Sequence, residues 1–428
     1  MSRQQRNTGR VYALAFWGLA CILGSVRAED WPGFRGPSGQ GISSEKGLPI
    51  HWKADENIAW KVAVPGEGWS SPVVCRDRVF LTTATDNGVS CRVLCFDRVS
   101  GKKRWDKEVY RQKPVRKEKR NSYATSTPAT DGQRVYAVFG DGGIVALDYE
   151  GEVVWINRDV HFYSQHGLGT SPLLYGDLLI LAFDGSSPTD DKTVGWQKPW
   201  DKSFLLALDK ATGKERWRAR RGLSRIAHTT PVVMKVAGRD QIISNAGDVV
   251  QGFDPANGKR LWSVRSEGEG VVPSPVCGAG LIFITSGFGS PTIRAVRPGA
   301  GVGQSAAVVW GEKHSVPMIP SMLYVRPYLF AISQDGIAQC LEAASGKNLW
   351  HERVGGSYSA SPICADAKIY LLSDGGETTI LEAGSQFKVV ARNRLEEHCQ
   401  ASLAASHGQL FLRTAKHLFC IGSHISRK

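Results

Sequence analysis

Short apolar runs separated by polar turns cover most of the chain. The first group contains the runs 72–75, 78–82 and 92–96, and a further strand begins near Trp105. The runs have the length of strands, Gly and Asp residues separate them, and no helical period lies between them. The pattern therefore predicts an all-β fold built from groups of four short strands.

One turn-and-strand motif recurs along the chain. Residues 207–217 read Ala-Leu-Asp-Lys-Ala-Thr-Gly-Lys-Glu-Arg-Trp, and copies occupy 95–105, 252–262, 340–350 and, in shortened form, 146–155. The acid and the Ser, Thr or Asn can bond the backbone of a tight turn, and Gly supplies a positive φ. The Trp starts the next strand and is large enough to pack across to a neighbouring unit. The recurrence indicates internal repetition.

A second marker, Ser or Thr followed by Pro, stands upstream of the turn copies. We assign Pro320 and Leu403 to the proline position of two degenerate copies, which gives eight units at intervals of 41–59 residues. Propeller blades repeat about every 40–50 residues, so eight units predict an eight-bladed β-propeller. The six regular markers are Ser71-Pro72, Thr127-Pro128, Ser171-Pro172, Thr230-Pro231, Ser274-Pro275 and Ser361-Pro362.

The two ends of the repeat array are incomplete in complementary ways. Residues 57–64 resemble the strand that follows each turn, whereas the last repeat stops after Ile421 without its Trp strand. We therefore predict that this N-terminal strand closes the last blade and places Trp60 in the same blade as Phe419, which leaves no long open edge. The expected division is a signal peptide at 1–28, a lead-in at 29–56 and the propeller at 57–424.

The tryptophans that begin the final strands are expected to be structural and mostly buried between blades. In the fifth copy Arg297 and Pro298 replace the acid, and the seventh copy lacks a Trp. The expected structural residues are Trp60, Trp105, Trp155, Trp217, Trp262, Trp310 and Trp350.

These residues resemble the pyrrolo-quinoline-quinone-type (PQQ-like) propeller repeat, whose signature is the acid, Thr-Gly and Trp run. The resemblance covers nearly the whole chain after residue 28. It implies either a quinoprotein dehydrogenase, an enzyme that uses PQQ and a metal, or a BamB-like scaffold of outer-membrane β-barrel assembly, which is not an enzyme. The run Asp-Trp-Pro-Gly-Phe-Arg-Gly-Pro at 30–37 is also similar to the start of many exported bacterial proteins of this repeat type.

The N-terminal 28 residues have the features of a secretory signal. A basic start precedes the apolar run 11–24, which is too short to span a membrane, and Ala28 occupies the cleavage position. We expect cleavage before Glu29 and export to the periplasm or cell envelope, or secretion. A lipid anchor at Cys21 is disfavoured because the Leu expected three residues earlier is missing.

The chain is basic, with a formal net charge of +13. Residues 1–28 hold four of the 53 basic residues and none of the 40 acidic ones, so an excess of positive charge remains after cleavage. It concentrates in the loop 107–120, which could meet an anionic partner such as lipid head groups or an acidic polysaccharide, although we favour a solvated loop. Export argues against a nucleic-acid partner.

Eight of the nine cysteines follow the predicted cleavage site. Cys95, Cys340 and Cys420 fall at the same place in three repeats, which indicates a small buried side chain. Cys399 and Cys420 could also form a disulfide, and the sequence leaves that pairing open. No Cys-x-x-Cys motif occurs, so neither a zinc ribbon nor attached haem is indicated.

The longest insertion, residues 184–203, combines four Asp with two Trp. Clustered Asp could bind Ca²⁺, but we favour a polar surface loop and assign no metal site. Exposed aromatic residues often belong to interfaces. The candidate partner-binding residues are Trp196 and Trp200 in this insertion and Arg116, Lys117, Lys119 and Arg120 in the basic loop.

The mouth of the propeller funnel is the natural place for a ligand. Aromatic and imidazole side chains just before the inner strands could bind a planar or sugar-like molecule. Alternatively, they end strands and bond the local backbone. The candidates are Trp69, Tyr123, His166, His228, Tyr358 and His398.

The chain lacks Gly-x-Ser-x-Gly, His-Glu-x-x-His and phosphate-loop motifs, as well as the adjacent Cys pair that the resemblance to quinoproteins implies. We therefore assign no catalytic residue and no cofactor. We favour a monomeric, exported, non-enzymatic binding propeller that contacts an envelope protein or polysaccharide, with outer-membrane protein assembly as one such role. A divergent quinoprotein dehydrogenase with PQQ and Ca²⁺ in the funnel, or another enzyme, remains the alternative.

Overall fold

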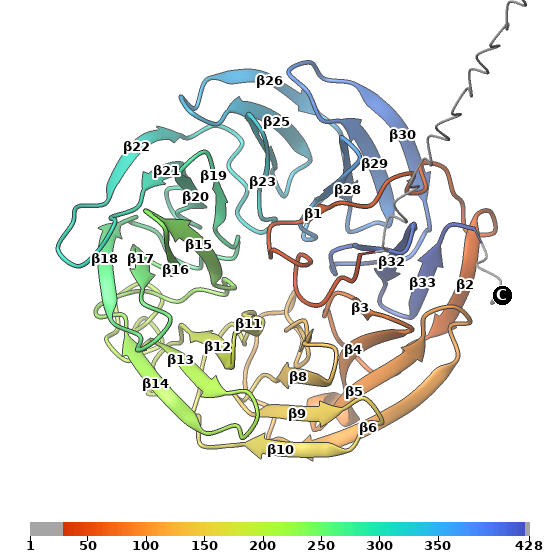
Figure 1. The fold of residues 1–428 in the computed structure, drawn as a ribbon, viewed down its shortest axis with the longest axis horizontal. Helices are drawn as coiled ribbons and strands as arrows, with labels where there is room; N and C mark the ends of the chain where they lie inside the picture. Colours follow the sequence, from red (N-terminus) through yellow and green to blue (C-terminus); the bar gives the residue numbers. More distant parts are fainter. Residues whose placement is uncertain (1–28, 424–428) are drawn as a thin grey trace, which may run out of the picture.

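Eight antiparallel sheets surround one central axis in the computed structural model, which describes residues 29–423 (Figure 1). Each sheet is a blade of four strands that step outward from the axis, and the seventh blade carries one additional short strand. The all-β, eight-bladed prediction is confirmed. The predicted signal peptide, residues 1–28, lies outside the described residues.

The first four blades follow one another along the chain. Blade 1 holds β3 (Val73–Cys75), β4 (Arg78–Thr85), β5 (Ser90–Asp97) and β6 (Lys103–Arg111), with a short 3₁₀ turn η1 (Asp86–Gly88). Blade 2 holds β7 (Ala129–Thr130), β8 (Arg134–Val138), β9 (Ile144–Asp148) and β10 (Val153–Asn157). Blade 3 holds β11 (Leu173–Tyr175), β12 (Leu178–Phe183), β13 (Phe204–Asp209) and β14 (Glu215–Arg220). Blade 4 holds β15 (Val232–Val236), β16 (Arg239–Ala246), β17 (Val249–Phe253) and β18 (Arg260–Arg265).

The remaining blades complete the ring. Blade 5 holds β19 (Val276–Gly278), β20 (Leu281–Thr285), β21 (Ile293–Arg297) and β22 (Ala307–Glu312). Blade 6 holds β23 (Leu323–Val325), β24 (Tyr328–Ile332), β25 (Ile337–Glu342) and β26 (Asn348–Arg353). Blade 7 holds β27 (Ile363–Ala365), β28 (Lys368–Leu372), β29 (Glu377–Glu382) and β30 (Val389–Arg394), joined by β1 (Ile42–Ser43). Blade 8 holds β31 (Ala404–Ser406), β32 (Gln409–Arg413), β33 (His417–Ile421) and β2 (Ile58–Ala63).

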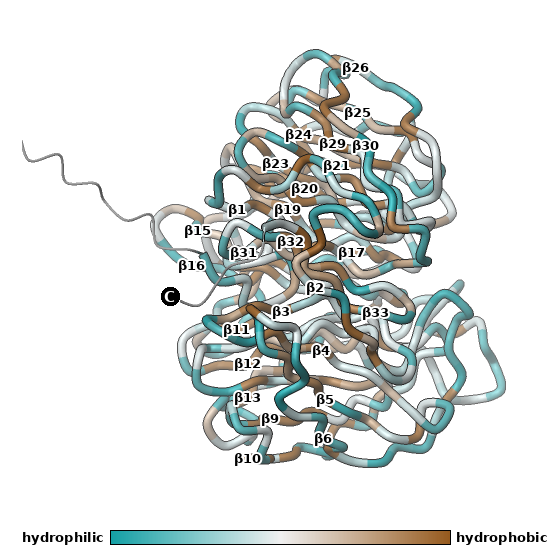
Figure 2. Tube along the Cα trace, turned by 90° about the vertical axis from the view of Figure 1, so that its right-hand side faces the viewer, coloured by the Kyte–Doolittle hydropathy of each residue, from teal (hydrophilic) through white to brown (hydrophobic). Residues whose placement is uncertain are grey.

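The position of a strand in its blade explains its hydropathy pattern. Every residue of β12 is buried, because adjacent blades cover both of its faces. The outer strand β14 instead alternates between exposed and buried residues. A strand covered on both faces reads as a continuous apolar run, whereas a half-covered strand alternates. Figure 2 shows this arrangement as brown strands within the ring and teal loops around it.

In every blade except the seventh, the recurring Trp of the outer strand contacts the next blade. The Trp217 indole N–H donates to Pro255 O at 3.0 Å, and a Cβ at Gly258 would lie only 2.5 Å from the Trp217 ring. Gly258 is therefore required both for its φ of +70° and for the close approach of the indole. The same indole-to-carbonyl bond links Trp60 to Arg98, Trp105 to Tyr149, Trp155 to Lys210, Trp310 to Ala343 and Trp350 to Gly384.

Trp262 makes a different contact because the next turn is altered. Its indole donates to Gln241 Oε1 at 2.7 Å, and Gln241 Nε2 in turn donates to Gly299 O in the fifth blade. The Gln241 amide therefore links Trp262 to the turn of the fifth blade, in which Arg297 and Pro298 replace the usual acid. Trp60, Trp217 and Trp262 are buried, whereas the other four structural Trp keep partial exposure.

The ring closes through the N-terminal strand. β2 pairs antiparallel with β33, which confirms that Trp60 and Phe419 share a blade; the register places Trp60 opposite Cys420 and Lys61 opposite Phe419. Glu397 reinforces this seam by accepting hydrogen bonds from Lys61 Nζ at 2.7 Å and from Thr414 Oγ1 at 2.6 Å. Partial burial raises the pKa of the Glu397 carboxyl, but these bonds and one from His417 outweigh it and lower the pKa to about 2.

The first part of the lead-in, residues 29–47, crosses the axis and contacts the inner strands of most blades (Figure 1). Trp31 pairs with Val74 of blade 1, and Pro32 O accepts the Thr130 N–H of blade 2. Gln40 Oε1 accepts the Cys277 N–H of blade 5 at 2.7 Å. β1 then pairs in parallel with β27 of blade 7. These bonds tie the lead-in to the ring on the side where the inner strands end.

The run 30–37 supplies the buried anchors of this lead-in. Trp31 is fully buried, and a Cβ at Gly36 would meet its ring at 2.7 Å. Arg35 is also buried and donates to Met322 O of blade 6 and to Gln40 O. Burial lowers the pKa of Arg35 to about 9. The sequence motif therefore seals one side of the axis.

All eight cysteines of the described chain are free, and seven are buried. Cys399 Sγ donates to Ser373 O at 3.3 Å and does not pair with Cys420. Cys95 lies between Phe80 and Trp105 in its sheet. Cys340 and Cys420 occupy the equivalent register in their blades, so this position holds a small core side chain.

Candidate functional site

A cavity of about 500 Å³ lies on the axis, and Phe34 of the lead-in forms part of its lining. The other lining residues come from the segments that precede the inner strands and from two long loops. The lead-in crosses the axis beyond the inner-strand starts, so the cavity has a floor and opens toward the loops. It is of the size of many small-ligand pockets, which span roughly 300–1,000 Å³.

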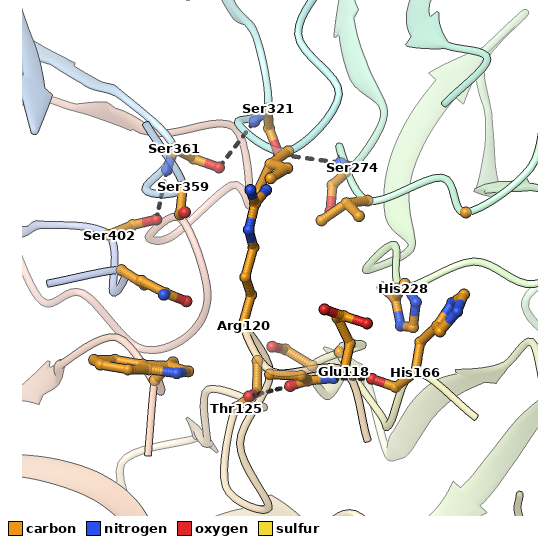
Figure 3. Close-up of a pocket in the computed structure, with 18 of the residues that line it drawn as sticks. Glu118, Arg120, Thr125, His166, His228, Ser274, Ser321, Ser359, Ser361 and Ser402 are labelled. Carbon is orange, nitrogen blue, oxygen red and sulfur yellow. Dashed lines mark hydrogen bonds between the residues drawn. The ribbon is translucent and has the colours of Figure 1, made fainter. Parts of the chain in front are cut away.

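A closed ring of eight hydrogen bonds surrounds this cavity. In each blade the N–H of the Ser or Thr before the inner strand donates to the hydroxyl oxygen of its counterpart in the next blade, and Ser402 closes the ring onto Ser71. Figure 3 shows the part of this ring from Ser274 to Ser402. The bonds measure 2.9 to 3.0 Å. In order, the ring residues are Ser71, Thr127, Ser171, Thr230, Ser274, Ser321, Ser361 and Ser402.

The ring corrects one assignment made from sequence. Ser321 takes the Ser position of the sixth blade, so Met322, not Pro320, stands in the place of the proline. The error arose because the proline was used as the marker, whereas the hydroxyl makes the contact between blades. Each of these hydroxyl oxygens accepts a hydrogen bond but donates none within residues 29–423. Their protons are therefore available to a molecule on the axis.

The rim of the cavity is formed by the residues two positions before each Ser or Thr of the hydrogen-bonded ring, which we call the hydroxyl ring. Alternate residues of an extended chain face the same side, so the side chain two positions earlier also faces the axis. Trp69 and His228 were expected here, but sequence reasoning missed the other positions because it did not apply this fixed offset. The full rim is Trp69, Thr125, Gly169, His228, Val272, Ile319, Ser359 and Gln400, and all eight line the cavity.

Two loops extend the wall above this rim. In the loop between blades 1 and 2, Asn121 Nδ2 donates to His166 O at 2.7 Å, which holds the loop against the next connection. This loop contributes Arg120 to the cavity, and the insertion 184–203 contributes Trp196. The Trp196 ring lies edge-on to His166, with centroids 5.2 Å apart. Residues from both predicted sets, rim and partner-binding, thus meet at one cavity.

The histidines of the cavity are held neutral near pH 7. Burial, together with the proximity of His166, lowers the pKa of His228 to about 3. Burial also lowers the pKa of His166, and the opposing effect of Glu118 is smaller. A Cβ at Gly169 would lie 2.7 Å from His228 Cβ, so glycine makes room for this imidazole. Both rings can therefore act as neutral hydrogen-bonding groups.

The charged side chains of the cavity differ in their partners. Glu269 Oε2 accepts from Arg225 Nη1 at 3.0 Å. In the described part of the chain, neither Arg120 nor Glu118 forms an ion pair. Figure 3 shows Arg120 reaching from its loop across the cavity toward the side that carries Ser321 and Ser361. The cavity therefore presents one cation, Arg120, and one carboxylate, Glu118, neither of which is ion-paired within the described residues.

Three predicted rim residues lie outside the cavity lining. The Tyr123 hydroxyl donates to Val115 O at 3.0 Å, and Tyr358 is buried. His398 Nδ1 lies 2.9 Å from Asp374 O, and its ring meets Trp69 edge-on. Tyr123 and His398 thus contact backbone carbonyls, as the alternative expectation had it, although the His398 acceptor is 24 residues away in the chain.

Four predicted partner-binding residues also lie outside the cavity. Lys117 Nζ contacts Glu67 at 3.4 Å and lies over the Tyr123 ring. Arg116 and Lys119 are exposed on the same loop. Trp200 is fixed by its backbone, which exchanges hydrogen bonds with Ser224.

The acidic residues of the insertion have separate roles. Asp184 is buried and forms a bidentate ion pair with Arg221, so it is not part of a surface loop. Asp191 accepts from Thr193 and Lys198 at the surface. Among residues 29–423, no group of three His, Cys, Asp or Glu side chains is placed to hold a metal.

The cavity residues do not fit a PQQ and Ca²⁺ site. Such a site needs several carboxylate and amide oxygens around the cation. The lining offers Glu118 and Glu269, of which Glu269 is already paired with Arg225, and Asn121 Oδ1 accepts from Ser122 and Thr125. We therefore derive no dehydrogenase step from this cavity.

No helix in residues 29–423 is both long and apolar enough to cross a membrane.

A family model described as "Outer membrane protein assembly factor BamB" matches residues 53–220. A curated protein of that description from Bordetella pertussis is 24% identical over 270 residues. The match covers 58% of this chain and 59% of that protein, less than two thirds of its length.

Solved structures share the architecture. BamB from Moraxella catarrhalis superposes with a TM-score of 0.59 at 14% identity, covering 87% of this chain and 99% of that one. The computationally designed protein Ika8 superposes with a TM-score of 0.57 at 11% identity, covering 89% and 99%. At such identities the likeness shows the fold alone.

Proposed function

We propose that the chain is an exported, non-enzymatic binding protein of the cell envelope, because it resembles PQQ-like propellers and is similar to BamB over part of its length. Its contact surface is the open face of the ring, around the axial cavity. The partner is an envelope protein or polysaccharide. Outer-membrane protein assembly, named in the description of the Bordetella relative, is one role in which such a surface would act.

The observation that carries this proposal is the difference between the two faces of the axis. The lead-in seals one face through bonds to the inner strands, whereas the two longest loops converge on the cavity at the other. A rigid ring that presents loops around a concave site is suited to binding. The unpaired Arg120 and the partly exposed Trp196 are residue types that dominate interface energetics.

Capture experiments with two tryptophan variants test this proposal. The protein without residues 1–28, bearing Trp196→Ala, should recover less of its partners from envelope extract than wild type. Trp200→Ala is the matched control, because it removes the same residue type from the same insertion outside the cavity. Quantitative mass spectrometry and carbohydrate analysis of the captured material provide the measurement.

The comparison between these variants decides the outcome. We expect Trp200→Ala to retain the wild-type partners and Trp196→Ala to lose most of them. Equal recovery by all three forms, or loss only with Trp200→Ala, would place the contact surface elsewhere. Circular dichroism spectra of the three forms show that each retains its sheet content.

A further inference from the structure

We propose that the axial cavity binds the terminal residue of a uronic-acid-containing polysaccharide. The inference rests on the proposed binding function and specifies the ligand class of its cavity. It draws on the charge of Arg120, the donors that line the axis, the aromatic wall and the closed floor.

Arg120 provides the recognition of a carboxylate. Its guanidinium lies at the cavity and has no carboxylate partner among the described residues. The loop that carries it is fixed, because Asn121 Nδ2 donates to His166 O and Lys117 Nζ donates to Asn121 O, each at 2.7 Å. The Arg120 side chain is itself exposed and makes no hydrogen bond within the described chain, so its guanidinium is free to bind a carboxylate through two parallel hydrogen bonds. The ligand is therefore expected to be anionic.

The remainder of the lining favours a hydroxyl-rich ligand. Seven of the eight ring hydroxyls face the cavity, and each already accepts a backbone N–H, which leaves its proton free to donate. Ser359 and Gln400 add polar groups at the rim, and His228 adds a neutral imidazole. A sugar carries many oxygen acceptors at short spacing, so it can use donors distributed around a ring.

Trp69 and Trp196 supply apolar surface in the same cavity. Neither is fully buried: Trp69 is packed against His398, and Trp196 against His166. Amphipathic aromatic side chains suit a ligand that has both apolar C–H surface and polar substituents, as a pyranose ring does. A simple inorganic anion would leave this aromatic surface unused.

The closed floor limits how a polymer can enter. Phe34 lines the cavity from the sealed side, where the lead-in is bonded to blades 1, 2, 5, 6 and 7. A polysaccharide therefore cannot thread through the axis, and only a chain end or a free uronate can occupy the cavity. Internal residues of a long chain should not bind.

Glu118 distinguishes a uronate from a zwitterionic ligand such as an amino acid. Its side chain lies on the His166 and His228 side of the cavity and has no ion-pair partner within the described chain (Figure 3). It repels a purely anionic ligand and attracts one that also carries an ammonium group. Neutralising it should therefore strengthen uronate binding and weaken the binding of a zwitterion.

Isothermal titration calorimetry with four forms of the protein tests this inference. Wild type, Arg120→Gln, Glu118→Gln and Lys119→Gln are titrated with galacturonic acid, trigalacturonate, polygalacturonate, galactose, glutamate and inorganic phosphate. Lys119→Gln is the matched control, because it removes a neighbouring charge that does not line the cavity. We expect uronates to bind wild type, and Arg120→Gln to weaken them about tenfold, the loss of roughly one charge-assisted hydrogen bond.

The other arms discriminate between ligands. Galactose should bind at least about tenfold more weakly than galacturonic acid, and Lys119→Gln should leave the affinity unchanged. Glu118→Gln should bind uronates more tightly than wild type, because it removes the repelling carboxylate. Polygalacturonate should bind in proportion to its chain ends rather than to its total uronate, whereas binding of the free acid alone would overturn the assignment to a polysaccharide.

Several results would overturn the inference. The first is that galactose binds as tightly as galacturonic acid, or that phosphate binds as tightly as uronate. The second is that Arg120→Gln binds uronate as tightly as wild type does. The third is that wild type binds glutamate more tightly than uronate and Glu118→Gln loses this glutamate binding. If uronates fail to bind but capture from envelope extract still depends on Trp196, the uronate assignment fails and the proposed binding function stands. If both fail, neither stands.

Discussion

Replacing Trp217 by alanine should lower the free energy of unfolding by about 3–5 kcal/mol, the usual cost of truncating a large buried aromatic. The Trp217 side chain is 8% exposed and packs across a blade boundary onto Gly258. The substitution also removes the indole N–H that satisfies Pro255 O. Urea unfolding followed by intrinsic fluorescence gives the measurement.

The control for this prediction is Trp200→Ala. Trp200 keeps its partner Ser224 through backbone bonds that the substitution leaves in place, so a smaller loss is expected. If Trp217→Ala unfolds at the wild-type urea concentration, the Trp does not couple the blades as the geometry indicates. The same conclusion would follow if the two variants were equally destabilised.

A second large effect is expected at the buried ion pair of blade 3, which contacts blade 4 through Ser244. The side chains of Arg221 and Asp184 are 0% and 1% exposed. Arg221 Nη2 donates to Asp184 Oδ2 at 2.8 Å and also to Ser244 Oγ. Asp184→Ala leaves a buried, uncompensated guanidinium, so it should lower the free energy of unfolding by about 3–5 kcal/mol.

The double variant Asp184→Leu, Arg221→Met separates the charge effect from packing. A buried pair replaced by apolar residues of similar volume is often neutral in stability, so the double variant should recover much of the loss. If it is less stable than Asp184→Ala, packing rather than the unpaired charge dominates at this position. Both variants are compared with wild type in the same urea unfolding experiment.

The fold could be predicted from the sequence because each blade contact repeats at a fixed offset. The Trp of one blade meets the Gly turn of the next, so both residues are constrained in every regular copy, as at Trp217 and Gly258. The closure by β2 followed from the missing strand after Ile421. Local turn chemistry and repetition were sufficient for these features.

The candidate site could be predicted only in part. Trp69 and His228 were identified by residue type, but Gln400 and Ser359 carry no signal of that kind and lie in the cavity because of their register with the hydroxyl ring. The sealing role of the lead-in depends on contacts such as Arg35 with Met322, 287 residues apart. Neither periodicity nor composition reveals a contact of that range.

The central claim, that the open face is the contact surface, is tested most directly by site-specific photo-crosslinking in envelope extract. A photo-reactive benzoylphenylalanine replaces Phe288, which lines the cavity and is 37% exposed, or Val154, which is 42% exposed on the outer strand β10. We expect a crosslinked product from position 288 and none from position 154. Crosslinking from position 154 alone, or equally from both positions, would contradict it.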